Sequence, residues 1–205
     1  MDNDKELEVG EAIPENELTV SDALVDYKKH YTFADYMSWD DEPRVELING
    51  EIHLMSSPTV QHQSILGNLY IEFANYLKGK TCKVWLAPFD VRLNMETTDD
   101  TVVQPDLVII CDKSIMMKTG CQAAPDMTIE ILSPSTKDKD MGIKLELYKK
   151  TGVREYWIID PELKKVIVYI FEIKDSIVRV YSENDIVPVH ILDGLEINLK
   201  DIFEE

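Results

Sequence analysis

The chain has 205 residues, 44% of them hydrophobic, and a formal net charge of −18. This length supports one well-buried domain and is short for two. No apolar run approaches the roughly 18 residues that span a bilayer, so we expect no membrane association. The acidic N-terminus lacks the basic and apolar pattern of a secretory signal, which predicts a cytoplasmic protein. We expect residues 1–25, acidic and poor in apolar residues, to form a disordered arm before one domain over residues 26–205.

The distribution of charge bears on nucleic-acid binding, because phosphate contacts need clustered Lys and Arg. Residues 1–20 hold seven acids and one Lys. Residues 137–154 hold six Lys or Arg against three acids, a local charge of +3. The overall acidity therefore does not exclude a nucleic-acid partner at that segment.

Three cysteines, Cys82, Cys111 and Cys121, are present. Their number is odd, and neither a Cys-x-x-Cys spacing nor a nearby His pair accompanies them. We therefore expect reduced thiols and no disulfide framework or zinc site.

The first predicted elements are a short helix and a hairpin. Residues 32–35 carry a capping-box pattern that begins the helix. Asn49-Gly50 predicts a tight turn between two strands within residues 44–55. This register places Glu46 opposite His53. An exposed cross-strand polar pair is the favoured interpretation, and a contact to an active centre is the alternative.

A long helix and a strand are expected next. Apolar residues recur at helical spacing over residues 58–80, and the single His62 in this helix is expected at its surface. Residues 84–93 alternate as a strand, which puts Asp90 and Arg92 on one face. We expect a salt bridge between these two side chains.

Two short runs rich in β-branched residues, 103–110 and 127–132, predict buried strands. Each carries one acid in its middle, Asp106 in the first and Glu130 in the second. Gln104 shares the Asp106 face because side chains alternate along a strand. A lone carboxylate in such a strand costs stability unless something pairs with it.

A helix predicted over residues 138–150 follows, with Lys144 on its apolar stripe. Two carboxylates and one ammonium could therefore meet at one point. Paired carboxylates are typical of Mg²⁺ sites, and a nearby Lys stabilises charge that develops on a phosphate. These roles together predict phosphodiester hydrolysis.

The C-terminal part predicts strands. Residues 153–160 and 165–171 are expected to pair antiparallel, and shorter strands follow at 177–181 and 187–192. The order of hairpin, helix, strands, helix and strands predicts a mixed α/β or α+β domain around one sheet.

An ordered set of motifs extends over about residues 30–203. The motifs are Val45–Glu51, Phe89–Val91, Pro105-Asp106, Ile129–Thr136, Lys144–Tyr148, Gly152–Pro161 and Pro188–Leu195. Together they resemble the Uma2 family of restriction-endonuclease-like proteins. The resemblance implies the PD-(D/E)XK nuclease fold, a restriction-endonuclease-like mixed β-sheet flanked by helices. It also implies that Asp106 and Glu130 bind Mg²⁺ or Mn²⁺ and that a lysine is catalytic.

One position departs from the motif. The strict motif has Lys two residues after Glu130, where this chain has Leu132, so Lys144 is the candidate for the lysine role. The auxiliary candidates are Glu46, Asp90, Gln104 and His62. The predicted function is a metal-dependent endonuclease whose partner is nucleic acid, DNA first, and a homodimer is left open.

Three alternatives stay open. The chain could be a binding or regulatory module that keeps the nuclease fold without catalysis, consistent with the net charge of −18 and with Leu132. The three ionisable residues Asp106, Glu130 and Lys144 could form a buried ion-pair network that fixes strand and helix register. A paired-carboxylate glycosidase is the weakest alternative, since it needs one acid with a raised pKa and no metal.

Overall fold

The computed structural model describes residues 29–39, 44–172 and 176–204, so the predicted acidic arm lies outside the described residues. The helices are α1 (Phe33–Tyr36), α2 (Val60–Leu77), the 3-10 turn η1 (Lys113–Ile115), α3 (Lys137–Met141), α4 (Ile143–Thr151) and α5 (Leu199–Ile202). The strands are β1 (Val45–Ile48), β2 (Glu51–Leu54), β3 (Lys83–Leu86), β4 (Asp90–Leu93), β5 (Thr101–Val103), β6 (Leu107–Ile110), β7 (Gly120–Cys121), β8 (Met127–Ile131), β9 (Glu155–Asp160), β10 (Lys165–Ile170), β11 (Ile177–Ser182), β12 (Ile186–Pro188) and β13 (Glu196–Asn198).

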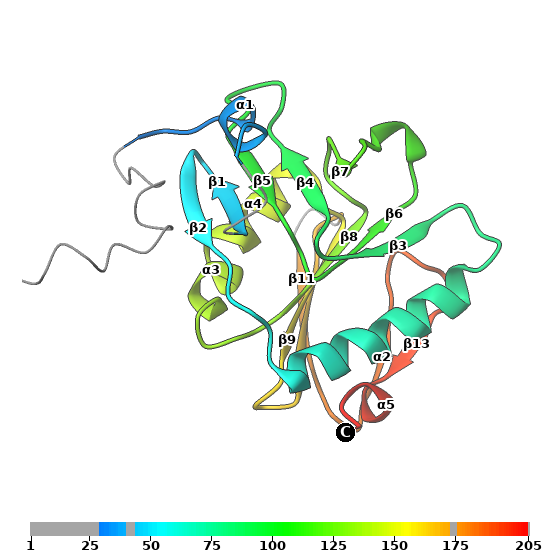
Figure 1. The fold of residues 1–205 in the computed structure, drawn as a ribbon. Helices are drawn as coiled ribbons and strands as arrows, with labels where there is room; N and C mark the ends of the chain where they lie inside the picture. Colours follow the sequence, from blue (N-terminus) through cyan, green and yellow to red (C-terminus); the bar gives the residue numbers. More distant parts are fainter. Residues whose placement is uncertain (1–28, 40–43, 173–175, 205) are drawn as a thin grey trace, which may run out of the picture.

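The described strands form two main sheets and a small one, in place of the single expected sheet (Figure 1). The six-stranded sheet has the order β11-β10-β9-β8-β6-β3, and the five-stranded sheet has the order β2-β1-β5-β4-β7. The strands β12 and β13 pair with each other. None of the described helices is long and apolar enough to cross a membrane.

Helix α2 covers one face of the six-stranded sheet, as its apolar periodicity predicts. Its residues Leu69 and Phe73 share a buried cluster with Ile129 of β8 and Trp157 of β9. The rings of Phe73 and Trp157 meet edge to face with centroids 6.1 Å apart. This contact fixes α2 against β9, which pairs with β8, the strand that carries Glu130.

The opposite face of that sheet packs against α4 and the five-stranded sheet. Because side chains alternate along β9, Tyr156 and Ile158 point away from α2. They share a second buried cluster with Tyr148 of α4 and Val91 of β4. The segment that carries Lys144 is thereby held over β8.

Several predicted elements are confirmed. Thr32 and Asp35 form a capping box at the start of α1. The hairpin has the predicted register, with Glu46 opposite His53, and both turn residues between β1 and β2 have positive φ values of 50° and 79°. Strands β9 and β10 pair antiparallel along their whole length.

Two predicted strands are each broken in two. The predicted strand 103–110 contains the end of β5 and all of β6, which belong to different sheets and are joined by a bend at residues 104–106. Residues 84–93 form β3 and β4, also in different sheets, with Pro88 in the connection. A proline has no N–H to donate to a ladder, so Pro88 and Pro105 suit points where the chain leaves one sheet for another. Asp106 therefore lies at a bend and not in mid-strand.

The helix predicted over residues 138–150 is also broken, because Gly142 separates α3 from α4. The φ and ψ values of Gly142 are −113° and −95°, which are not helical. This break lets α4 take its own direction, and Lys144 lies in its first turn.

The expectation of three reduced thiols is wrong for two of them. Cys82 and Cys111 form a disulfide, while Cys121 is free and buried. The antiparallel pair β3–β6 places Lys83 opposite Ile110, so the next residues outward, Cys82 and Cys111, also face each other. Sequence spacing gave no signal of this contact because it arises from strand pairing across 29 residues.

Candidate active site

Asp106 is held by two other elements. The backbone N–H of Ile131 in β8 donates to its Oδ2 at 2.7 Å, and Nε2 of His62 in α2 lies 3.1 Å from the same oxygen. His62 is buried, so its predicted surface position is wrong. Burial lowers the pKa of His62, but the Asp106 carboxylate outweighs this effect and leaves the pKa above its ordinary value.

Glu130 is buried at the centre of β8. Its Oε1 accepts hydrogen bonds from Nζ of Lys144 at 2.8 Å and from the hydroxyl of Tyr148 at 2.9 Å. Burial raises the pKa of Glu130 well above its ordinary value, and the neighbouring carboxylates add to this effect while Lys144 opposes it. Tyr148 thus orients the carboxylate.

Lys144 is the buried cation of the cluster, with 2% of its surface exposed. Its Nζ lies 2.7 Å from Glu46, 2.8 Å from Glu130 and 3.4 Å from Asp140. Burial lowers the pKa of Lys144, but the three carboxylates outweigh burial and raise the pKa well above its ordinary value. The lysine therefore stays charged. Because Leu132 occupies the position of the motif lysine, the position of Lys144 beside Glu130 makes Lys144 the candidate for that lysine.

Glu46 lies in this cluster, so the favoured interpretation of an exposed pair with His53 is wrong. Its side chain is fully buried. It is paired with Lys144 and Lys139, and the backbone N–H of Gln104 donates to its Oε1 at 2.9 Å. The β1–β2 hairpin therefore delivers a carboxylate to the lysine, which was the alternative interpretation.

Asp90 lies beside the cluster and not within it. The expected salt bridge with Arg92 is wrong, because Arg92 pairs with Asp99 through two hydrogen bonds of 2.6 and 2.7 Å. Oδ1 of Asp90 instead accepts from the hydroxyl of Tyr36 at 2.9 Å and from Nε2 of Gln104 at 3.0 Å. Gln104 connects Asp90 with the cluster, because its side-chain amide donates to Asp90 and its backbone N–H donates to Glu46.

A cavity of about 180 Å³ lies among Asp106, Glu130 and Lys144. Because it is the candidate active site, we call it the catalytic cavity. Its ionisable and amide lining residues are Arg44, Glu46, His62, Gln63, Gln104, Asp106, Glu130, Lys139, Asp140 and Lys144. Asp140 and Lys139 were not predicted as site residues from the sequence. The spacing of four residues between Asp140 and Lys144 on one predicted helix could have indicated the first of them.

Comparison with known proteins identifies the family of this chain. A family model described as "Uma2: Putative restriction endonuclease" matches residues 33–200. The chain belongs to the Uma2 family. An uncharacterized protein of Synechocystis sp. is 27% identical over 127 residues, which cover 61% of this chain. The chain spans 65% of the length of that curated relative.

A solved structure shares the fold of this Uma2 chain. It is described as the crystal structure of a "putative nuclease belonging to DUF820" from Anabaena variabilis. The two align with a TM-score of 0.70 and 23% identity, over 84% of this chain and 97% of that chain. This likeness confirms the predicted fold class of mixed sheets flanked by helices.

The restriction-endonuclease-like fold implies a divalent metal, and the cavity of this Uma2 chain fits one. Among the described residues no group of three or more His, Cys, Asp or Glu is arranged to hold a metal ion. Mg²⁺ needs only one or two carboxylates, since water and substrate phosphate supply its other ligands. Four carboxyl groups, from Glu46, Asp106, Glu130 and Asp140, line the cavity together with three cationic side chains, from Arg44, Lys139 and Lys144. The buried Oδ1 of Asp140 has no hydrogen-bond partner and lies 3.4 Å from the ammonium of Lys144, so this oxygen suits a cation.

The predicted basic segment offers less free charge than its composition indicates. Within residues 137–154, four of the six cations form ion pairs; they are Lys137, Lys139, Lys144 and Arg154. A nucleic-acid strand at the cavity therefore meets few unpaired lysines from this segment.

Proposed function

We propose that the protein is a Mg²⁺- or Mn²⁺-dependent endonuclease that hydrolyses phosphodiester bonds in DNA. One observation carries the proposal. Asp106, in the bend before β6, and Glu130, in the neighbouring strand β8, line one cavity together with a buried lysine whose Nζ lies 2.8 Å from Glu130. The family description and the nuclease-like fold support the same reaction class.

Each residue then has a separate task. Asp106 and Glu130 would hold the divalent cation, which when bound lowers the pKa of a water molecule and neutralises charge on the phosphate. The Ile131 N–H and the Tyr148 hydroxyl fix the orientation of the two carboxylates. Lys144 holds a positive charge at a buried position, where such a charge stabilises the phosphorane-like transition state. Glu46 keeps Lys144 in place.

One observation favours the alternative of a nuclease-fold module without catalysis. All three carboxylates around Lys144 lie within 3.4 Å of its Nζ. In a purely structural role these ion pairs would join α4 to α3, β1 and β8, and Lys144 would not contact a phosphate.

The test is a cleavage assay. Supercoiled plasmid, a single DNA strand and an RNA strand are incubated with Mg²⁺ or Mn²⁺ and either the parent protein or Asp106→Asn. We expect metal-dependent cleavage of DNA by the parent and at least about a hundredfold loss in the variant. A parent that leaves every substrate intact with both metals would establish the module instead.

A further inference from the structure

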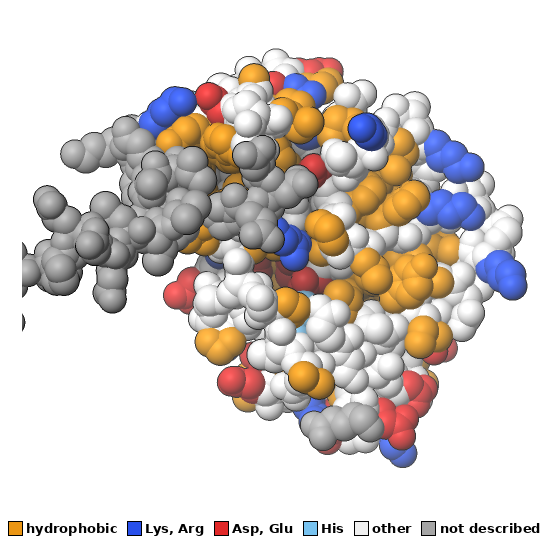
Figure 2. Space-filling model, in the orientation of Figure 1, with side chains coloured by type: hydrophobic (Ala, Val, Ile, Leu, Met, Phe, Trp, Pro, Cys, Tyr) orange, Lys and Arg blue, Asp and Glu red, His pale blue; other side chains and the backbone are white. Residues whose placement is uncertain are grey.

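A second and larger cavity lies next to the catalytic cavity. Its volume is about 800 Å³, within the usual range of ligand sites. Arg44, Leu86 and Gln104 line both cavities. We call this second cavity the aromatic pocket. Figure 2 shows hydrophobic side chains gathered over β3, β4 and β7 on this face of the molecule.

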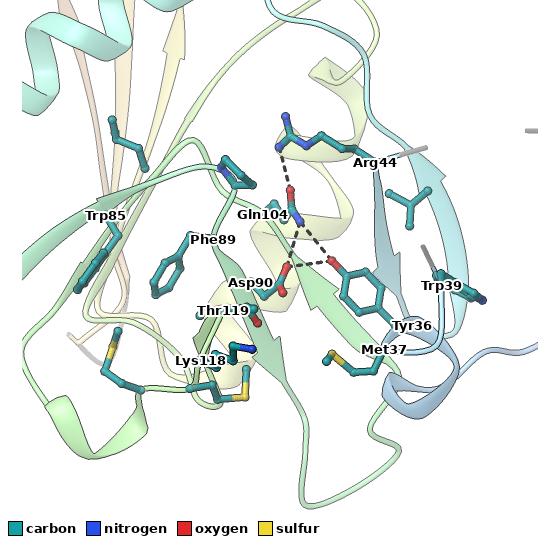
Figure 3. A pocket seen from close by; sticks show the side chains of 16 residues that line it. Tyr36, Met37, Trp39, Arg44, Trp85, Phe89, Asp90, Gln104, Lys118 and Thr119 are labelled. Atoms are coloured by element: carbon teal, nitrogen blue, oxygen red, sulfur yellow. Dashed lines mark hydrogen bonds between the residues drawn. The ribbon is translucent and has the colours of Figure 1, made fainter. Parts of the chain in front are cut away.

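Aromatic rings form two walls of the pocket. Trp85 and Phe89 stack with ring centroids 5.5 Å apart, and Trp85 is 40% exposed. Tyr36 and Trp39 stand on the opposite side, with centroids 5.8 Å apart (Figure 3). Flat faces on both sides of a cavity suit a flat ligand, because aromatic rings stack on one another.

The pocket also contains a polar network between these walls. Gln104 accepts from Nη2 of Arg44 at 2.8 Å and donates through Nε2 to Asp90 at 3.0 Å and to Tyr36 at 3.2 Å (Figure 3). Burial raises the pKa of Tyr36, and the neighbouring Asp90 raises it further, so its hydroxyl stays protonated. A flat ligand with hydrogen-bonding groups on its edge would meet a carboxylate, an amide and a hydroxyl.

Charge indicates how a nucleic acid could bind such an acidic protein. The net charge of −18 opposes affinity that depends on phosphate contacts alone. Arg44 and Lys118 are exposed at the pocket and supply only a small positive contribution. Base stacking on aromatic side chains adds affinity that needs no net positive charge.

We propose that the aromatic pocket receives an unstacked nucleobase of the substrate strand, so that the catalytic cavity acts on single-stranded or locally opened DNA. This inference rests on the proposed function. The shared lining residues Arg44 and Gln104 would place the base beside the catalytic cavity. A base within a paired duplex is stacked on its neighbours, so its faces are not free to stack on the aromatic rings of the pocket.

The test measures binding without metal, on the full chain carrying Asp106→Asn. The probes are a fluorescent single DNA strand, an abasic sugar–phosphate strand of equal length and the fully paired duplex. We expect the base-containing strand to bind most tightly. Adding Trp85→Ala should weaken that binding by about tenfold to a hundredfold and leave binding of the abasic strand unchanged.

Two further variants make the result decisive. Tyr70→Ala removes an aromatic residue of similar exposure, 39%, outside the pocket and should change neither binding constant. Trp85→Phe keeps a ring and should retain most of the binding, which separates stacking from a folding defect. Equal weakening of both strands by Trp85→Ala, or tighter binding of the duplex, would overturn the inference. The binding result does not depend on cleavage, so an inactive parent leaves it readable.

Discussion

Replacing Lys144 with Met should lower the rate of DNA cleavage by about a hundredfold to a thousandfold, the usual effect of removing one charge-stabilising group. The same change should lower the free energy of unfolding by about 3–5 kcal/mol, because it leaves buried carboxylates without their cation. Glu130 would lose its 2.8 Å partner and Glu46 its 2.7 Å partner. Single-turnover cleavage and urea denaturation measure the two effects.

A double variant separates the catalytic effect from the structural one. Adding Asp140→Asn to Lys144→Met removes one of the three carboxylates, and we expect part of the stability to return while cleavage stays low. Lys149→Met, an exposed position in the same helix, is the matched control and should alter neither property. Full cleavage by Lys144→Met would exclude this lysine from the reaction.

Glu46→Gln should lower the free energy of unfolding by about 3 kcal/mol at neutral pH, because Lys139 and Lys144 each lose a buried partner. Glu51→Gln on the same hairpin removes an exposed acid and should cost less than about 0.5 kcal/mol. Urea denaturation of both variants and the parent gives the comparison. Equal stability of Glu46→Gln and the parent would mean that these ion pairs make no net contribution to the free energy of unfolding.

The difference between Glu46→Gln and the parent should depend on pH. Burial raises the pKa of Glu46, but Lys144 and Lys139 outweigh burial and lower it from 4.5 to about 2. A carboxyl whose folded pKa is below its unfolded pKa stabilises the protein above the unfolded value. That contribution is lost as the pH falls from 4.5 toward 2. The stability difference should therefore shrink over this range.

The sequence predicted local features of the fold well. The hairpin register and the capping box depend on a few adjacent residues, and both are confirmed. The sequence failed where the chain changes sheets, at residues 87–89 and 104–106, because residues typical of strands lie on both sides of each bend. The disulfide escaped prediction for a related reason, since strand pairing brings its two cysteines together from 29 residues apart.

The three principal residues of the candidate site were predicted from the sequence, but only some of the residues around them were. Asp106, Glu130 and Lys144 are ionisable side chains in apolar patterns, and the structure gathers all three at one cavity. Glu46 was interpreted as exposed, because alternation within a hairpin cannot show which face another element covers. The burial of His62 depends on where Asp106 lies, which the sequence left open.

The binding of a divalent cation by Asp106 and Glu130 is tested most directly by melting the protein at increasing Mn²⁺ concentrations. A ligand bound only to the folded state adds about 2.7 kcal/mol at a hundredfold excess over its Kd. We expect the melting temperature of the parent and of the control Glu51→Gln to rise with Mn²⁺, while Asp106→Asn and Glu130→Gln stay nearly unchanged. An equal rise in all four proteins, or no rise in the parent, would contradict a metal site at these two carboxylates.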